Sequence, residues 1–237
     1  MDFKVVAHRN LLTLLQAFDS EKLARCKFLF GGGTRIVLQL DEYRESRGIY
    51  LLCSDRNGYA EIRAEVGVGG YAALFKPDAL DQLGFPGEMR INQHGIRFPV
   101  ELEGEMIPVE LFLEPRIDLD PGVRPEWSPV DCLSLTDCQA EKLLANSDRW
   151  ADRQALSRDL IDLGALRSRC GSFPEAVWAK AEEAYSLTIR KDLFKALNAF
   201  AGDSSHQRRC FEGLQIDRPE EILDGLSRLR QDILKDS

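Results

Sequence analysis

Apolar residues in the first half of this 237-residue chain alternate between helical spacing and short continuous runs. Apolar positions three and four apart are typical of a helix that covers a core, whereas a short apolar run bounded by glycine is typical of a buried strand. The predicted helices span 8–25, 34–40 and 58–66, and the predicted strands span 27–30 and 49–53. The glycine-rich segment 67–86 favours neither structure.

From Glu88 the apolar period changes to two, which is the period of a strand with one buried face. The predicted strands span 89–92, 95–102 and 106–113. Glu103-Gly104 supplies a tight turn between the last two strands, so we expect an antiparallel meander. Because four prolines follow within 115–131, we predict a linker or lid over 115–133.

The helical period returns after residue 133 and continues through the rest of the sequence. The predicted helices span 135–146, 152–168, 174–185, 189–201, 205–213 and 219–234. This layout predicts an α+β protein with a mixed sheet followed by a C-terminal helical bundle. The expected divisions are a core over 1–114, the linker or lid, and a helical domain over 134–237.

Composition places the chain among soluble globular proteins. Apolar residues make up 44% and charged residues 30%, and no apolar run approaches the roughly 20 residues of a membrane span. The N-terminus lacks the pattern of a secretory signal, so we expect a cytoplasmic protein without a membrane partner. The net charge of −8 gives no overall basic face for nucleic acid. We expect Trp127, Trp150 and Trp178 in a core or interface rather than as base-stacking platforms.

The segment Gly31-Gly32-Gly33-Thr34 lies between a predicted strand and a predicted helix. Small residues in such a turn let backbone N–H groups approach a phosphate, and the helix N-terminus favours negative charge. Taken alone, three glycines are also typical of an ordinary tight turn. The order of the later motifs makes the segment more specific. These motifs are Arg44-x-Ser46, Val109-Glu110-Leu111, Lys142 within Ala140–Ala145, and Arg158-Asp159-x-x-Asp162.

These motifs, in this order, resemble those of the AbiEii/AbiGii toxin family of nucleotidyltransferases. Members of that family are the toxin halves of type IV toxin–antitoxin and abortive-infection systems. The resemblance covers most of residues 10–165. It implies a polymerase-beta-like nucleotidyltransferase fold, with a nucleoside triphosphate and Mg²⁺ in the site. It also implies transfer of a nucleotide to tRNA or other RNA, and a cognate antitoxin protein as partner.

The resemblance also assigns roles to individual residues. It implies nucleotide binding by Gly32, Gly33, Thr34, Arg44, Ser46, Lys142, Arg158 and Asp162, with Lys142 on the phosphates. It implies catalytic roles for Glu110 and Asp159, and a metal-binding role for Glu110. We expect Gly33, Thr34, Glu110, Lys142 and Asp159 to line one cleft.

The chain departs from the family at the residues that should hold the metal. After the Arg-x-Ser element the family carries an acidic-apolar-acidic triplet, where this chain has Gly48-Ile49-Tyr50. Gly48 has no side chain, and the neutral phenol of Tyr50 is a poor Mg²⁺ ligand compared with a carboxylate. Asp55 lies in a sequence typical of a helix cap, not of a substitute ligand. We therefore predict weak metal binding and an inactive or severely impaired enzyme.

Two functions stay open at this point: an impaired toxin-type enzyme, or a pseudoenzyme that binds nucleotide, RNA or protein without turnover. A third interpretation is an unrelated scaffold with a coincidental glycine turn. Structural roles also compete with the functional ones. Glu110 could face solvent from a strand, Lys142 could be a surface lysine, and Arg44 and Ser46 could shape a turn. Arg158, Asp159 and Asp162 could form an ion-pair face, and the basic cluster Arg149, Arg153 and Arg158 could be a solvated helix face.

Overall fold

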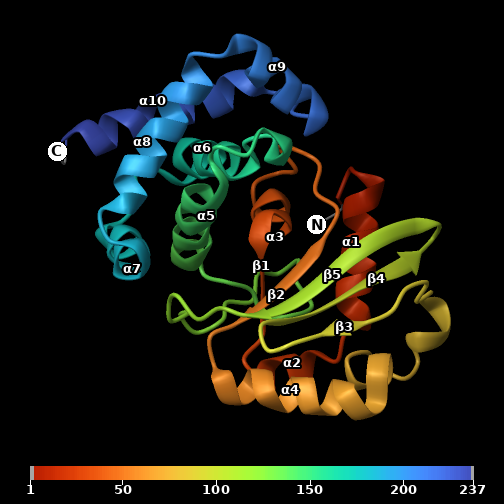
Figure 1. Cartoon of the computed structure of the whole chain (residues 1–237). Helices are drawn as coiled ribbons and strands as arrows, with labels where there is room; N and C mark the ends of the chain where they lie inside the picture. Colours follow the sequence, from red (N-terminus) through yellow and green to blue (C-terminus); the bar gives the residue numbers. More distant parts are fainter. Residues whose placement is uncertain (1–2, 236–237) are drawn as a thin grey trace. The chain divides into compact units, whose positions relative to one another are not determined.

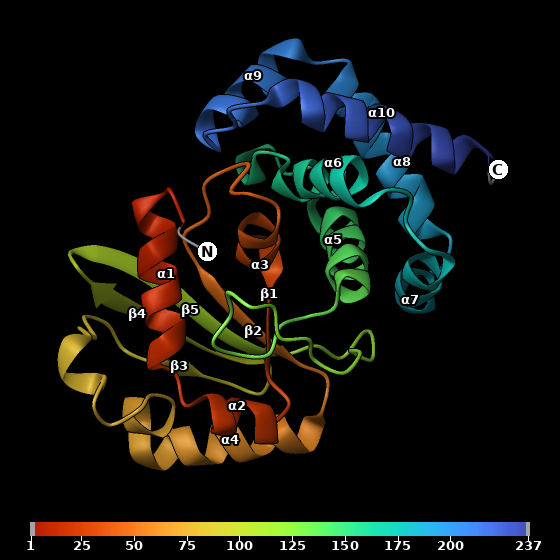
Figure 2. The same cartoon turned by 180° about the vertical axis from the view of Figure 1, so that it is seen from behind.

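The computed structural model describes residues 3–235 (Figures 1 and 2). Contacts within the chain divide it into two compact units. The first contains Met1–Arg35 and Ser46–Ser134, and the second contains Ile36–Glu45 and Leu135–Ser237. Residues 115–133 belong to the first unit, and the lid role expected for them stays a prediction.

A five-stranded mixed sheet forms the centre of the first unit, which confirms the predicted fold class. Its strands are β1 (Leu29–Gly31), β2 (Ile49–Cys53), β3 (Arg90–Ile91), β4 (Gly95–Leu102) and β5 (Glu105–Leu113). Their order across the sheet is β1-β2-β5-β4-β3. The pair β2 and β5 is parallel, and the other neighbouring strands are antiparallel.

The turn between β4 and β5 fixes which side chains meet across the sheet. Glu103 and Gly104 both have positive φ, 51° and 78°, as a two-residue hairpin turn of type I′ requires. The resulting register places Arg97 opposite Glu110. On the other edge of β5, Tyr50 of β2 lies beside Glu110. Since neighbours in register project to the same side, these three residues share one face of the sheet.

The helices of the first unit differ in length from those that the apolar pattern predicts, and the helix Arg56–Gly69 is longer than the predicted helix 58–66. They are α1 (Val6–Ala17), α2 (Ser20–Arg25), α4 (Arg56–Gly69) and the short 3₁₀ turns η1 (Gly70–Ala73) and η2 (Leu80–Gln82). The single helix predicted over 8–25 is wrong. Phe18 and Asp19 are extended, and the Asp19 side chain accepts a hydrogen bond from the Lys22 N–H to begin a new helix. Figures 1 and 2 show α2 and α4 side by side along the sheet, where α4 buries Ile62 and Val66.

Helix α4 begins at a side-chain cap, as the sequence predicts. Asp55 precedes the helix, and its Oδ1 accepts hydrogen bonds from the N–H groups of Asn57 and Gly58. The carboxylate satisfies two of the four donors that a helix start leaves open. Asp55 therefore has the structural role that its sequence surroundings predict.

The second unit is helical throughout residues 135–235, which confirms the predicted bundle. Its helices are α5 (Leu135–Arg149), α6 (Arg158–Cys170), α7 (Glu175–Tyr185), α8 (Thr188–Ala201), α9 (Ser204–Gly213) and α10 (Pro219–Lys235), with a 3₁₀ turn η3 (Arg153–Ala155). The predicted helix 152–168 begins six residues late, at Arg158, because Leu156 and Ser157 have left-handed φ values of 52° and 47°.

Two helices of the second unit cross at a pair of glycines. A Cβ added to Gly225 of α10 would lie 2.0 Å from the carbonyl oxygen of Gly164 of α6. Only glycine permits backbones to approach so closely. The crossing fixes α6, which carries Asp159 and Asp162, against α10.

Helix α3 (Gly32–Gln39) begins in the first unit and ends in the second. It starts two residues before the predicted helix 34–40, because Gly32, with φ of +69°, already opens the turn. No helix among residues 3–235 is long and apolar enough to cross a membrane. Trp127 and Trp178 are buried as expected, whereas Trp150 is partly exposed.

Candidate functional site

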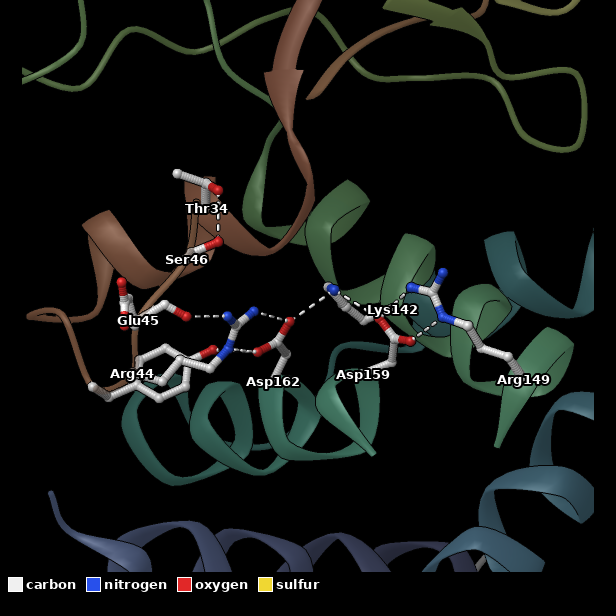
Figure 3. A network of polar contacts seen from close by, with 9 residues as sticks. Thr34, Arg44, Glu45, Ser46, Lys142, Arg149, Asp159 and Asp162 are labelled. Atoms are coloured by element: carbon white, nitrogen blue, oxygen red, sulfur yellow. Dashed lines mark hydrogen bonds and ion pairs between the residues drawn. The ribbon is translucent and has the colours of Figure 1, made fainter. Parts of the chain in front are cut away.

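The glycine turn of the first unit is tied to the segment before β2 by two hydroxyl groups (Figure 3). The Thr34 hydroxyl donates to the Gly48 carbonyl at 2.6 Å and lies 2.7 Å from the Ser46 hydroxyl. Because a hydroxyl has a single proton, Ser46 must be the donor to Thr34. Thr34 is fully buried. The structure thus brings Thr34, Ser46 and Gly48 together, and their polar groups form hydrogen bonds with one another.

The ring of Tyr50 covers the two glycine positions of this region. A Cβ added to Gly32 would lie 3.1 Å from Cδ2 of Tyr50. A Cβ added to Gly48 would lie 3.0 Å from Cε2 of Tyr50 and 3.4 Å from Pro108. These distances are shorter than ordinary van der Waals contacts. Tyr50 therefore occupies the space that a side chain at position 48 would need.

Glu110, the acidic residue in register with Tyr50 on this face of the sheet, already has a cationic partner. Arg97 Nε donates to Glu110 Oε2 at 2.8 Å from the neighbouring strand. The Glu110 side chain is 31% exposed, so the pair lies at the surface of the first unit. The guanidinium neutralises the carboxylate that the family resemblance assigns to metal and catalysis.

The residues present do not fit the metal that the resemblance implies. In a nucleotide site Mg²⁺ is held by one or two carboxylates together with waters and substrate phosphates. Here Gly48 and Tyr50 supply no carboxylate, and Glu110 is engaged by Arg97. Across residues 3–235 there is no group of three or more His, Cys, Asp or Glu side chains arranged to hold a metal ion.

The second unit contains a buried network of charges centred on Asp162 of α6 (Figure 3). Arg44 Nε donates to Asp162 Oδ1 at 2.7 Å and its Nη2 donates to Oδ2 at 2.9 Å. The Tyr43 hydroxyl donates to the same Oδ1 at 2.6 Å. Asp162 has no exposed surface, and Arg44 is 4% exposed. The bidentate geometry is the strong form of an arginine–carboxylate pair.

Lys142 of α5 joins Asp162 to Asp159. Its ammonium lies 2.7 Å from Asp162 Oδ2 and 2.8 Å from Asp159 Oδ1. Arg149, seven residues further along the chain, donates from Nε to Asp159 Oδ2 at 2.6 Å and from Nη2 to Oδ1 at 3.0 Å. The network therefore alternates in sign, with Arg44, Lys142 and Arg149 against Asp159 and Asp162, and carries one net positive charge.

The network keeps each of its members in the charged form at neutral pH. Burial alone would raise the pKa of the Asp162 carboxyl, but the charges of Arg44 and Lys142 outweigh it and hold that pKa below its usual range. Burial would likewise raise the pKa of Asp159, which Lys142 and Arg149 lower instead. Burial would lower the pKa of Lys142, and the two carboxylates raise it. The pKa of the Tyr43 phenol is raised well above 10 by burial and by Asp162.

The residues that the sequence singles out fall into separate groups. Thr34, Ser46 and Gly48 meet in the first unit, and Arg44, Lys142, Asp159 and Asp162 meet in the second. Gly33 lies in the first turn of α3. Arg158 is exposed and makes no hydrogen bond or ion pair with a described residue. The surface-lysine interpretation of Lys142 is wrong, because its side chain is 8% exposed. The convergence of both groups on one cleft stays a prediction.

Sequence analysis missed three side chains that complete these groups. Tyr43 belongs to none of the motifs that the sequence analysis identifies. Arg149 belongs to the basic cluster for which a solvated helix face is one interpretation, and the structure shows that it binds Asp159. Arg97 could have been found by counting equal numbers of residues back from each side of the Glu103-Gly104 turn, since that count pairs it with Glu110.

Comparison with known proteins identifies the family. The family model described as "Nucleotidyl transferase AbiEii toxin, Type IV TA system" matches residues 13–231. The chain belongs to the AbiEii family. No curated protein matches the chain. The recognised motifs and the AbiEii match agree, which rules against the unrelated-scaffold interpretation.

Two solved structures share the fold of this AbiEii member. JHP933 from Helicobacter pylori matches with a TM-score of 0.56 and 12% identity, over 99% of this chain and 96% of that one. A second structure, described as a candidate nucleotidyltransferase from H. pylori, matches with a TM-score of 0.52 and 12% identity, over 100% and 99% of the two chains. At this identity the likeness concerns the fold, and it extends over the full length of the chain.

Proposed function

We propose that this chain is a toxin-type AbiEii protein whose transfer of a nucleotide from a nucleoside triphosphate to RNA, such as tRNA, is severely impaired. Its expected setting is a cytoplasmic toxin–antitoxin or abortive-infection system with a cognate antitoxin. The proposed impairment rests on the residues Gly48, Tyr50 and Glu110 at one face of the sheet. Beside Tyr50 on that face lies the Glu110 carboxylate, which Arg97 neutralises, and the Tyr50 ring occupies the place where a second acid would project.

The size of the expected impairment follows from the chemistry of phosphoryl transfer. Such reactions are catalysed mainly by positioning and by neutralising charge on the transferred group, largely through metal ions. A site with a paired Glu110 and with no acid at positions 48 and 50 loses most of this contribution. We expect residual nucleotide affinity, because the α3 N-terminus and Lys142, whose raised pKa keeps it charged, are retained.

A pseudoenzyme that binds nucleotide, RNA or a partner protein without turnover is the alternative. The Arg97–Glu110 ion pair favours it, because that pair occupies the carboxylate that lies beside Tyr50 on the sheet face. The buried network of Arg44, Lys142, Asp159 and Asp162 fits both functions, since it supports the second unit whether or not transfer occurs.

The experiment is a comparison of designed variants in one labelling assay. Purified protein is incubated with total RNA, each labelled nucleoside triphosphate in turn, and Mg²⁺ or Mn²⁺. We expect weak or no labelling by the natural chain and clear labelling by the double variant Gly48→Asp with Tyr50→Asp. The matched control is Gly48→Asn with Tyr50→Asn, which has nearly the same side-chain size without the charges. Adding Arg97→Gln to the aspartate variant should raise labelling further, because it frees Glu110.

The outcomes separate the two functions. Strong labelling by the natural chain would overturn the proposed impairment. Labelling by the asparagine control equal to that of the aspartate variant would show that the charges do not matter. A folded aspartate variant that labels RNA with none of the four nucleotides would favour the pseudoenzyme.

A further inference from the structure

Ser46 is the residue at which the chain returns to the first unit. The chain leaves this unit after Arg35, the segment Ile36–Glu45 belongs to the second unit, and Ser46 is the first residue back. Gly48 and strand β2 follow directly. Because a whole segment of the other unit separates Ser46 from the glycine turn, contacts through space must hold the two together.

A buried histidine holds the backbone of Ser46. The Ser46 N–H donates a hydrogen bond at 3.1 Å to Nε2 of His8, which lies on α1 in the same unit. His8 has no exposed surface. A ring nitrogen that accepts a hydrogen bond carries no proton, so the His8 ring is neutral and its proton lies on Nδ1.

His8 begins a chain of hydrogen bonds that reaches the glycine turn. Beyond the His8–Ser46 bond, the Ser46 hydroxyl donates to the Thr34 hydroxyl at 2.7 Å (Figure 3). The Thr34 hydroxyl donates in turn to the Gly48 carbonyl at 2.6 Å. Thr34 belongs to the first turn of α3, where helix geometry leaves the backbone N–H groups without intrahelical acceptors. The chain of bonds therefore connects α1 to the part of the turn that would receive a phosphate.

Packing alone does not explain a histidine at this position. His8 shares the buried face of α1 with Leu11 and Leu15, three and seven residues later. A polar ring in such a face costs free energy unless it is hydrogen-bonded, whereas another leucine would carry no such cost. The hydrogen bond from Ser46 offsets that cost. What histidine adds beyond packing is thus the position of Ser46.

We propose that His8 is a positioning residue for phosphate binding at the glycine turn. Its ring holds Ser46, and through Thr34 it fixes the first turn of α3 without touching the phosphate itself. The inference deepens the proposed function and rests on it in one respect, namely the nucleotide affinity expected to remain at this turn. It requires neither a metal ion nor transfer of a nucleotide.

The first measurement needs no ligand. The ¹⁵N signals of histidine rings distinguish a nitrogen that carries a proton from one that does not. The chain has three histidines, and the signals of His8 are identified by their loss in His8→Gln. We expect a proton on Nδ1 and none on Nε2. A proton on Nε2 of the folded natural chain would overturn the proposal, because that nitrogen could not accept from Ser46.

The second measurement uses inorganic triphosphate as the probe and the amide signals of Gly33 and Thr34 as the readout. We expect triphosphate to shift both signals to saturation in the natural chain. His8→Leu, which removes the acceptor, should weaken triphosphate binding about tenfold, the effect of one lost hydrogen bond. His8→Asn, whose oxygen lies one bond short of the Nε2 position, should show the same loss. His8→Gln, whose oxygen can take the place of Nε2, should bind nearly as tightly as the natural chain.

Leu14→Ala separates positioning from stability. Leu14 is a fully buried residue of α1, and its truncation should lower the melting temperature at least as much as His8→Leu does. Triphosphate binding should nevertheless stay unchanged, because Leu14 lies more than one helical turn beyond His8.

Three binding results would overturn the proposal: no shift of the Gly33 and Thr34 signals in the folded natural chain, equal affinity in His8→Leu and the natural chain, or equal losses in Leu14→Ala and His8→Leu. The last would show a merely structural role. If His8→Leu does not fold, the comparison of His8→Asn with His8→Gln decides. Failure here is distinguishable from failure of the labelling assay, since that assay tests transfer with a metal ion present.

Discussion

Replacing Asp162 by asparagine tests whether the charge network holds the second unit together. The substitution keeps the size and shape of the side chain but removes its negative charge. The carboxylate has four contacts shorter than 3 Å, from Tyr43, from two nitrogens of Arg44 and from Lys142, and no exposed surface. Asp162→Asn leaves three cations with Asp159 as their one carboxylate, so the buried net charge rises from one to two.

The expected loss in the free energy of unfolding is large, because the cations that lose the Asp162 carboxylate are buried away from water. Removing one partner of a buried ion pair costs about 3–5 kcal/mol. At about 2–4 °C per kcal/mol for a chain of this size, the melting temperature of the second unit should fall by about 6–20 °C. Asp203→Asn is the matched control. Its partner Arg153 is 60% exposed, and asparagine still caps α9, so this variant should unfold at nearly the same urea concentration as the natural chain.

The assay is urea unfolding followed by circular dichroism, repeated across pH. Because the pKa values of Asp159 and Asp162 are lowered in the folded state, their contribution to stability is present above about pH 4 and is lost as the pH falls toward the folded values. The raised pKa of Lys142 gives a contribution that is complete below about pH 10 and is lost at higher pH. In Asp162→Asn the free energy of unfolding should therefore fall less steeply as the pH is lowered below about 4. A loss no greater than that of Asp203→Asn would refute the reasoning.

Further predictions concern packing and capping. Gly225→Ala should lower the free energy of unfolding by about 2 kcal/mol or more, because the new Cβ would lie 2.0 Å from the Gly164 carbonyl oxygen. Gly67→Ala should stabilise α4 by about 0.5–1 kcal/mol in urea melts, because the new Cβ there meets nothing within 4 Å. Asp55→Ala should cost about 1 kcal/mol through its lost cap, and Asp55→Asn much less. Gly48→Asp alone should destabilise the chain by about 1 kcal/mol, because the new side chain displaces the Tyr50 ring. Adding Tyr50→Asp to that variant should relieve this cost. Additive effects of the two substitutions in a double-mutant cycle would contradict the coupling.

The sequence predicted elements well wherever the apolar period was strong, and it failed where the backbone changed without a sequence signal. Strand β2 begins and ends where the apolar run 49–53 does. The late start of α6 was missed because Leu156 and Ser157 adopt left-handed φ values that usually belong to glycine or asparagine.

For the candidate site, the sequence found the residues of the network but not the contacts between them. Arg44 and Asp162 are 118 positions apart, and nothing in local spacing says that they meet. The pairing of Arg97 with Glu110 was also missed, although the register set by the two-residue turn predicts it. Side-chain contacts made by tertiary folding, such as the Tyr50 ring against Gly48, require coordinates.

The short segment Ile36–Glu45, which belongs to the second unit, has a consequence for how the protein is made. A ribosome reaches Arg44 well before Asp162, and at about 5–20 residues per second the intervening 118 residues take about 6–24 s to synthesise. Throughout that time the Arg44 guanidinium is on the nascent chain, and the Asp162 carboxylate that it binds has not been synthesised. The helical unit therefore completes its folding only after most of the chain has been translated, and a fragment cut at residue 134 separates Tyr43 and Arg44 from the carboxylate that they bind.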